Sequence, residues 1–235
     1  MLKIENLTKK YGDKVAVNNL SLEINKGEIY GFIGHNGAGK TTTLKCVVGI
    51  SDFDEGKITL NGVSVKENPV EYKKKIAYIP DNPDLYEYMT GIKFLNFISD
   101  VFGIDTNTRK EKIDKLSEQF EIKNDLGKPI STYSHGMKQK LAIIAAWIHS
   151  PEFIIMDEPF VGLDPKAAYI LKGMMREACD NGCAIFFSTH VLEVAEKLCD
   201  KIAIIKKGDL IKSGTMEEVK GDDSLEDVFL EMEEN

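Results

Sequence analysis

The sequence lacks three features that would each point to a particular class of protein. It has no surplus of basic residues: 30 Lys and Arg stand against 38 Asp and Glu, a formal net charge of −8. Broad nucleic-acid binding needs a basic face, so no nucleic-acid partner is expected. No apolar run approaches the roughly 18 residues of a membrane-spanning helix. The start of the chain carries no apolar stretch behind a basic segment, so no signal peptide is expected.

Cysteine is scarce and shows no metal-binding pattern. The four cysteines stand at positions 46, 179, 183 and 199, without the paired spacing of a zinc ribbon. Cys179 and Cys183 lie one helical turn apart, which indicates reduced cysteines that pack within helices of a cytoplasmic protein. Apolar residues, in contrast, make up 43% of the 235 residues. They suffice for a sizeable core in one large domain or two closely packed subdomains.

The first third of the chain predicts strands joined by turns. Apolar residues mostly alternate with polar ones over residues 15–24, which predicts a half-buried antiparallel strand. The continuous apolar run Ile29–Ile33 predicts a strand that is covered on both faces. Residues 57–60 and 63–65 flank Asn61-Gly62 and predict a hairpin, because Asn-Gly readily adopts the positive φ angles of a tight turn.

The rest of the chain predicts a helical segment and then alternating strands and helices. Between about residues 90 and 150 apolar residues recur at helical spacing in three stretches, with Pro129 separating the second from the third. Afterwards the pattern predicts strands at 153–156, 184–187 and 202–205 and helices at 165–179 and 191–198. Such alternation is typical of a parallel sheet. The expected fold class is α/β, with an antiparallel β part on the N-terminal side and an inserted α-helical part.

Residues 34–41 match the pattern G-x-x-x-x-G-K-[ST] between the strand Ile29–Ile33 and a helix-compatible segment. Glycines let backbone N–H groups converge on phosphates, which also meet the positive end of the helix dipole. Lys40 can neutralise the β- and γ-phosphates, and the Thr41 hydroxyl can bind Mg²⁺. The pattern alone predicts a nucleoside triphosphate site. The candidate phosphate-binding residues are Gly34, His35, Asn36, Gly37, Ala38, Gly39, Lys40, Thr41 and Thr42.

Two acids, Asp157 and Glu158, follow the apolar segment 153–156. A buried strand there would place Asp157 at its carboxyl end, where ligands bind in open α/β sheets. Asp157 suits the Mg²⁺ shell, and Glu158 suits polarising an attacking water. Acids that simply end a strand at the surface are the alternative, and the phosphate loop upstream disfavours it.

Taken in order, these motifs resemble the nucleotide-binding subunit of an ATP-binding cassette (ABC) transporter over essentially the whole chain. Tyr11 stands where the family places an aromatic that stacks on adenine. Residues Gly162, Leu163 and Asp164 match the family's loop that touches a partner subunit, and His190 matches its switch histidine. The resemblance implies a single ABC ATPase domain over residues 1–235 with a P-loop NTPase core. ATP and Mg²⁺ are its expected cofactors, with Glu158 and His190 as catalytic residues.

The signature segment and one metal position depart from the family pattern. Residues 133–137 read Tyr-Ser-His-Gly-Met, where the family usually has Leu-Ser-Gly-Gly-Gln. Ser134 and Gly136 keep a hydroxyl and amides at a helix start, suited to a γ-phosphate, while His135 adds bulk. The expected signature residues are Ser134, His135, Gly136 and Met137. The family's metal-linking glutamine should follow a strand such as Ile76–Ile79, where Asp81 and Asn82 stand instead. Asp81 can bind a metal-bound water, and either residue could do this work.

The resemblance also implies partners. Two copies, in the simplest case a homodimer, would sandwich two ATP molecules, with each phosphate loop facing the Ser134 segment of the other copy. Because the chain has no membrane span, the permease would be a separate polypeptide that docks on the helical insertion at about residues 90–150, near Asp81. The chain would then lie in the cytoplasm, peripheral to the inner face of the cell membrane. Residues 133–140 and 225–230 look like the exporter branch, which handles drugs, antimicrobial peptides or polysaccharides.

Two other functions fit the sequence less well. A soluble cassette ATPase acting on ribosomes or DNA usually carries tandem cassettes, a long coiled coil or basic extensions, none of which this sequence shows. A regulatory module that holds ATP without turnover is disfavoured by Glu158 and His190. The remaining single residues are expected to be structural: His35, His149 and Trp147, together with solvated acids at 217–218, 222–223 and 226–227.

Overall fold

A six-stranded sheet forms the centre of the chain. The computed structural model describes the backbone of residues 1–234 and the side chains of residues 1–232. The strands of this sheet are β3 (Ile29–Ile33), β6 (Ile76–Ile79), β7 (Phe153–Asp157), β8 (Ala184–Thr189), β9 (Lys201–Lys206) and β10 (Asp209–Thr215). Their order is β10-β9-β3-β8-β7-β6, and all pairs are parallel except β9 with β10. The mostly parallel α/β fold expected from the sequence is confirmed.

A second, antiparallel sheet lies on the N-terminal side. Its strands are β1 (Leu2–Tyr11), β2 (Lys14–Ile24), β4 (Glu55–Leu60) and β5 (Val63–Ser64), in the order β2-β1-β4-β5. The predicted hairpin is the pair β4–β5, and both Asn61 and Gly62 have the positive φ angles, 49° and 82°, of the expected tight turn. The expected antiparallel part at the front of the chain is therefore confirmed.

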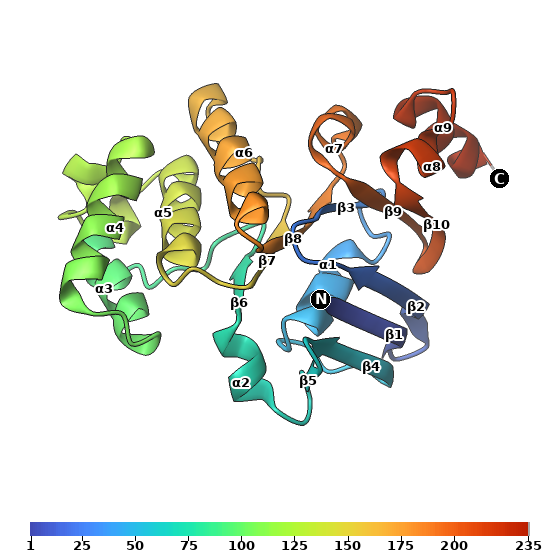
Figure 1. Cartoon of the computed structure of the whole chain (residues 1–235), viewed down its shortest axis with the longest axis horizontal. Coiled ribbons are helices and arrows are strands. Elements are labelled where there is room, and N and C mark those ends of the chain that lie inside the picture. The colour runs from blue at the N-terminus through green and yellow to red at the C-terminus, as the bar shows by residue number, and fades with distance from the viewer. Residues whose placement is uncertain (235) are drawn as a thin grey trace.

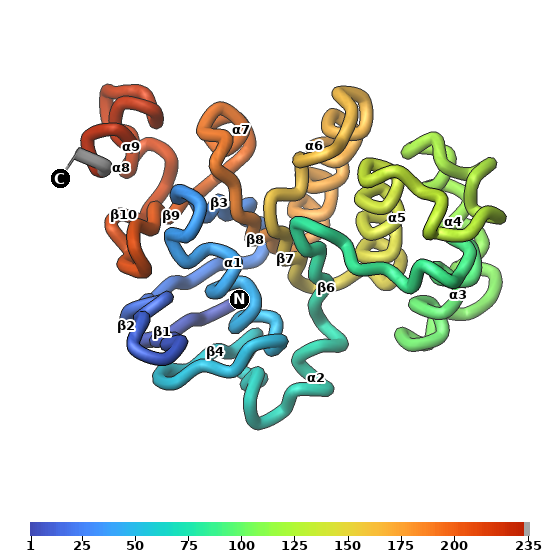
Figure 2. The backbone as a smooth tube through the Cα atoms, turned by 180° about the vertical axis from the view of Figure 1, so that it is seen from behind, coloured from blue at the N-terminus to red at the C-terminus, as the bar shows by residue number. Residues whose placement is uncertain are grey.

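The helices fall into groups that cover different parts of the two sheets. They are α1 (Lys40–Val47), α2 (Pro69–Lys74), α3 (Gly91–Val101), α4 (Thr106–Gln119), α5 (His135–Ile148), α6 (Pro165–Asp180), α7 (Leu192–Leu198), α8 (Met216–Lys220) and α9 (Leu225–Glu234). Figure 1 shows α3, α4 and α5 gathered at one end of the molecule, away from the antiparallel sheet. The reverse view in Figure 2 shows the same separation. These three helices lie within the insertion expected at about residues 90–150.

The central sheet is covered on both faces, which explains the unbroken apolar run of β3. Successive side chains of a strand point to opposite faces. Ile29 and Ile33 belong to the core shared with the helical part and α6, whereas Tyr30 and Phe32 belong to the core shared with α1 and the antiparallel sheet. The sheet thus joins two hydrophobic cores, and the carboxyl ends of its parallel strands meet at one edge.

Cys179 lies in α6, and Cys183 lies just beyond its end. The helix α6 ends at Asp180, and a turn follows in which the Cys183 N–H donates to the Ala178 carbonyl at 3.0 Å. Cys183 therefore does not lie in a helix, since Gly182, at φ 89°, has already reversed the chain. All four cysteines are buried and free of disulfides.

Trp147 is partly buried against the core, as expected. The six acids at 217–218, 222–223 and 226–227 are exposed, also as expected. Across the described residues, no helix has both the length and the hydrophobicity to span a bilayer. Residue 235, the last of the expected 1–235 domain, lies outside the described part.

Candidate nucleotide site

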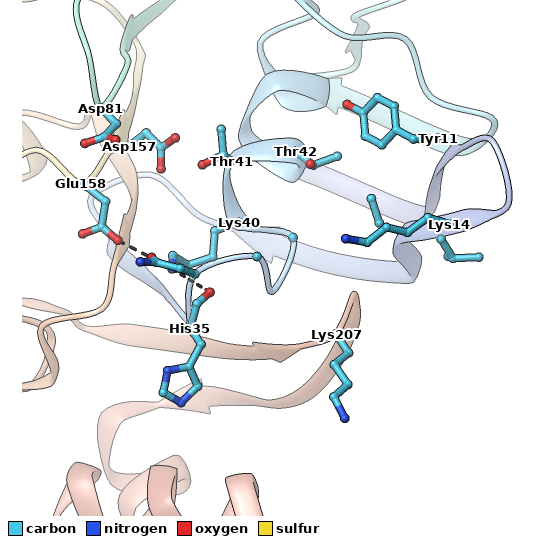
Figure 3. A pocket seen from close by; sticks show the side chains of 15 residues that line it. Tyr11, Lys14, His35, Lys40, Thr41, Thr42, Asp81, Asp157, Glu158 and Lys207 are labelled. Atoms are coloured by element: carbon cyan, nitrogen blue, oxygen red, sulfur yellow. Dashed lines mark hydrogen bonds and ion pairs between the residues drawn. The ribbon is translucent and has the colours of Figure 1, made fainter.

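A cleft of about 640 Å³ opens at the carboxyl edge of the central sheet. Figure 3 shows its walls: the turn between β1 and β2 on one side, the phosphate loop in the middle, and a group of carboxylates on the other side. The labelled side chains that line it are Tyr11, Lys14, His35, Lys40, Thr41, Thr42, Asp81, Asp157, Glu158 and Lys207. The fold thus brings the predicted phosphate loop, both predicted acids and the predicted adenine aromatic to one cavity.

The phosphate loop turns sharply into α1 at Gly39. This residue has φ 114°, and a Cβ there would lie 2.5 Å from the Ala16 carbonyl oxygen, so only glycine fits. The turn leads directly into Lys40, Thr41 and Thr42 in the first turn of α1. The free N–H groups of a helix start and its dipole favour an anion at this place. The loop therefore has the geometry that phosphate binding requires.

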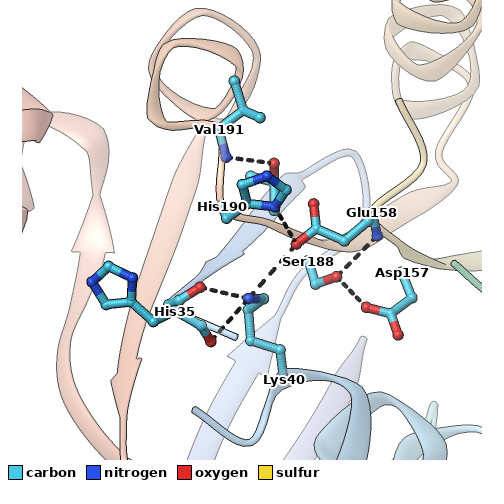
Figure 4. Close-up of polar contacts among 9 residues, drawn as sticks. His35, Lys40, Asp157, Glu158, Ser188, His190 and Val191 are labelled. Carbon is cyan, nitrogen blue, oxygen red and sulfur yellow. Dashed lines mark hydrogen bonds and ion pairs between the residues drawn. The ribbon is translucent and has the colours of Figure 1, made fainter. Parts of the chain in front are cut away.

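Lys40 is the buried cation of the cleft, with only 6% of its side chain exposed. Its Nζ donates to the carbonyls of Gly34 at 2.5 Å and His35 at 3.3 Å, and lies 3.6 Å from Glu158 Oε1 (Figure 4). Burial lowers the pKa of Lys40, and the carboxylates of Glu158 and Asp157 oppose that effect. A phosphate would be a stronger charge partner for this ammonium than two neutral carbonyl oxygens.

Ser188 on β8 holds both acids. The register of β7 and β8 sets Asp157 opposite Ser188, and the Ser188 hydroxyl donates to Asp157 Oδ1 at 2.5 Å. The Glu158 N–H lies 3.0 Å from the Ser188 hydroxyl oxygen and 3.2 Å from its carbonyl oxygen (Figure 4). The sequence motifs do not indicate a role for Ser188. The available signal was its position two residues before His190 at the end of a predicted strand.

Glu158 faces the cleft from an unusual backbone conformation. Its φ is 47°, which costs about 1 kcal/mol or more for a residue other than glycine. Its side chain is 12% exposed, and Oε1 lies 3.0 Å from His190 Nδ1, whose ring is half exposed. Two candidate catalytic residues are therefore in direct contact. Strained backbone of this kind is frequent at functional sites.

The oxygens near the acids suit a magnesium ion. Thr41, Asp157 and Asp81 offer hydroxyl and carboxylate oxygens, the ligands that Mg²⁺ prefers, and all three line the cleft. Within residues 1–234 no group of three His, Cys, Asp or Glu side chains could hold a metal alone. Such a site fits Mg²⁺, which usually binds through one or two carboxylates together with substrate phosphates.

Asp81 lies beside the two acids, as Figure 3 shows. Burial raises the pKa of Asp81, the charges of Asp157 and Glu158 raise it further, and His135 and His190 oppose the rise. Asn82, also described, is exposed and is not among the residues that line the cleft. Of the two residues, Asp81 therefore lies at the cleft and Asn82 does not.

Tyr11 lies at the far side of the cleft from the acids (Figure 3). It is 52% exposed, and the Lys9 ammonium lies 4.9 Å from its ring centroid. Lys14 and Lys207 line the same side, and their positive charges suit a phosphorylated ligand. Neither lysine was predictable from the sequence, because single surface lysines form no pattern.

The signature segment is not part of the cleft of its own chain. Ser134 caps α5 by accepting the Met137 N–H at 3.3 Å, and its side chain is exposed. Among the described residues that line the cleft, none comes from 134–137 or from 162–164. These two segments instead contact each other, and Lys140 in α5 forms a 2.7 Å ion pair with Asp164.

Comparisons with known proteins agree with this geometry. A family model described as ABC transporter matches residues 17–161. The ABC-type transporter ATP-binding protein EcsA of Bacillus subtilis (strain 168) is 35% identical over 99% of this chain and 96% of its own length. The bacitracin transport ATP-binding protein BcrA of Enterococcus faecalis is 36% identical over 93% and 70%. A solved ATP-binding subunit of an ABC transporter superposes with a TM-score of 0.95 at 32% identity, covering 99% of both chains.

Proposed function

The chain belongs to the ATP-binding subunits of ABC transporters, an ATPase family, and we propose that it powers a separate membrane subunit by closing and opening a dimer around ATP. Its nucleotide site is the cleft of about 640 Å³. In this proposal the phosphate loop holds the phosphates, Lys40 neutralises the β- and γ-phosphates, and Tyr11 stacks on adenine.

The metal and the hydrolytic step would use the opposite wall. Thr41, Asp157 and Asp81 would hold Mg²⁺, which would supply positive charge to the phosphate oxygens. Glu158 would accept a proton from an attacking water, since Ser188 holds its backbone N–H at the cleft and its carboxylate contacts His190. His190, half exposed beside Glu158, would contact the γ-phosphate.

The proposal of a dimer rests on one observation: the Ser134 segment lies outside the cleft of its own chain. It nevertheless has the features of an anion site, namely an exposed hydroxyl and free amides at the start of the 14-residue helix α5. A second copy can bring this segment to the cleft, with the loop 162–164 beside it. ATP would then stabilise the closed dimer because both copies contact it, and hydrolysis would remove that stabilisation.

The membrane subunit would dock at the junction of β6 with α3 and α5. A groove of about 260 Å³ lies there, lined mostly by apolar side chains. Its lining includes Ile76, Pro80, Leu85 and Phe94. Beside the groove, Tyr86 lies 5.9 Å from Tyr88 and 5.8 Å from Phe97, ring to ring, and all three are exposed.

The occupant that fits this groove is a short amphipathic helix from a cytoplasmic loop of the permease. Its apolar face would cover the exposed aromatics and the apolar lining of the groove. The chain would then lie at the cytoplasmic face of the membrane. Export is the proposed direction, supported by the exporter-like segments 133–140 and 225–230 and by a relative that is named for bacitracin transport.

Co-purification from native membranes tests this function. Two tyrosines with the same 80% exposure offer a matched pair: Tyr88, in the exposed aromatic group, and Tyr169, on α6. Tyr88→Asp should lower recovery of the tagged chain with a polytopic membrane protein about tenfold or more, the effect of removing an interface aromatic worth ~1.4 kcal/mol. Tyr169→Asp should not. Equal recovery of both variants, or a parent chain that neither hydrolyses ATP nor binds membranes, would overturn the proposal.

A further inference from the structure

The start of α5 is in direct contact with the loop that follows Glu158. A Cβ at Gly162 would lie 2.4 Å from Cδ2 of His135, so the imidazole ring rests on the backbone of residue 162. A Cβ at Gly136 would lie 2.7 Å from the Gly162 carbonyl oxygen. The two segments are therefore packed without space for a further methyl group at either glycine.

Two more contacts join α5 to the two ends of the same loop. The buried Gln139 donates through Nε2 to the Pro159 carbonyl at 3.3 Å. Lys140 pairs with Asp164 at 2.7 Å, and Asp164 also caps α6 by accepting the Ala167 N–H at 2.8 Å. The loop 159–164 is thus held at its beginning, at its middle and at its end. At the middle of the loop, the contact is made by the His135 ring, which covers Gly162.

The loop is continuous with the backbone of Glu158. The Val161 N–H donates to the Glu158 carbonyl at 3.1 Å, and the Leu163 N–H donates to the Phe160 carbonyl at 3.3 Å. Glu158 itself has φ 47°, a conformation that persists only where the surrounding structure imposes it. A change in the conformation of the loop would therefore change the direction in which the Glu158 carboxylate points.

We propose that His135 is a positioning residue for Glu158, which acts by holding Gly162 and with it the loop 159–164. The proposal rests on the proposed function for the water-activating role of Glu158. In the proposed dimer the Ser134 segment faces the nucleotide of the second copy. His135 then lies between that nucleotide and the loop that follows Glu158 of its own chain.

Hydrogen exchange of the full chain without nucleotide tests the contact independently of any ATPase activity. His135→Ala should speed exchange of the Val161 and Leu163 amides about tenfold or more, because the loop opens locally without the ring. His135→Phe keeps a ring on Gly162 and should exchange as the parent does. Lys166→Ala removes the exposed ion pair with Glu121 at the start of α6 and serves as the control. Unchanged exchange in His135→Ala would overturn the proposal.

A double-mutant cycle gives a second test. Gly162→Ala in the parent adds a collision with His135 to the strain of φ 79°, whereas in the His135→Ala background only the strain remains. The two substitutions should therefore be non-additive in thermal denaturation, with Gly162→Ala lowering the melting temperature less in the second background. Additive shifts would mean that the ring does not hold the loop.

Steady-state ATPase measurements complete the test. His135→Ala should lower kcat about 10-fold, because without the ring the loop no longer holds Glu158 in its orientation. His135→Phe should restore kcat. If exchange changes and kcat does not, the ring holds the loop but does not position Glu158. If Glu158→Gln retains parental turnover, the proposed function itself fails, whatever the exchange result.

Discussion

At the scale of single residues, the cleft depends on a few buried polar contacts. Ser188 is fully buried and contacts both acids. Its hydroxyl donates to the Asp157 carboxylate, and its hydroxyl oxygen accepts from the Glu158 N–H. Lys40 is almost fully buried and has Glu158 as its nearest acid. Buried polar groups are costly when they lose a partner, so substitutions at these positions have effects that are larger than those at exposed ones.

Replacing Lys40 tests the phosphate site. Lys40→Ala should weaken ATP binding by about 2–4 kcal/mol, the range for removing one partner of a charge pair at a binding site. Isothermal titration calorimetry measures this directly. Lys45→Ala is the control, because Lys45 lies on the same helix α1 with an exposed side chain. An unchanged affinity in Lys40→Ala would place the phosphates elsewhere.

Replacing Ser188 tests the arrangement of the acids. Ser188→Ala leaves the buried Asp157 carboxylate and the Glu158 N–H each without one partner, so the free energy of unfolding should fall by ~1–3 kcal/mol. Turnover should fall as well. Ser99→Ala is the matched control, because Ser99 is equally buried but donates only to the Leu95 carbonyl of its own helix. Equal losses in the two variants, measured by urea denaturation, would contradict a special role for Ser188.

Much of the cleft was predictable from the sequence because its residues are neighbours along the chain. Residues 34–42 follow one another, and Asp157 and Glu158 directly end a strand. Ser188, Lys14 and Lys207 were not predictable, since the strand order β3-β8-β7 and the packing of the two sheets bring them to the cleft. The contact of His135 with Gly162 joins two segments that the sequence indicated separately.

At the scale of elements, regular periodicity decided which helices and strands were predictable. The helices α3 and α5 and the strands β3 and β7 follow one period throughout and were predicted. The strand β1 was not predicted, because Asn6 has φ 51° and the pairing register shifts between Ile4 and Leu7, which interrupts the alternation. The edge strand β10 has no buried residue, and α8 and α9 carry many exposed acids around a few buried residues.

His149 joins α5 to two other elements and should make stability depend on pH. Its ring stacks on Phe102 at 3.7 Å, and Nε2 contacts the Ile76 carbonyl at 3.1 Å. Burial lowers the pKa of His149 below 6.5. The unfolded chain therefore takes up a proton that the folded chain resists, so this contribution to stability is lost as pH falls through the ordinary histidine range.

Urea denaturation at about pH 7.5 and about pH 5.5 measures this effect. His149→Phe keeps a ring against Phe102 but cannot titrate, so its stability should fall less on acidification than that of the parent. The comparison uses the change between the two pH values, because the substitution also removes the contact with Ile76. An equal fall in parent and variant would show that the pKa of His149 is the same in the folded and the unfolded chain, which contradicts the prediction.

At the scale of the whole molecule, the phosphate loop and the signature segment lie apart. The central sheet separates the antiparallel sheet from the helices α3, α4 and α5, and the Ser134 segment belongs to that helical end (Figures 1 and 2). In the proposed dimer, a second copy brings this segment to the cleft. ATP should therefore cause two chains to associate, whatever the identity of the permease.

The mass of the Glu158→Gln chain with ATP and Mg²⁺ tests that claim most directly. An amide cannot accept the proton from water, so turnover should fall by about 10²-fold or more and the closed dimer should persist. Size-exclusion chromatography with light scattering should give twice the 26.3 kDa of one chain with ATP and a single chain with ADP. Ser134→Asp, added to this variant, keeps a good helix cap but opposes the γ-phosphate and should abolish the dimer, whereas Ser134→Asn should keep it. A Glu158→Gln chain that stays monomeric with ATP, or that dimerises equally well with Ser134→Asp, would contradict the account.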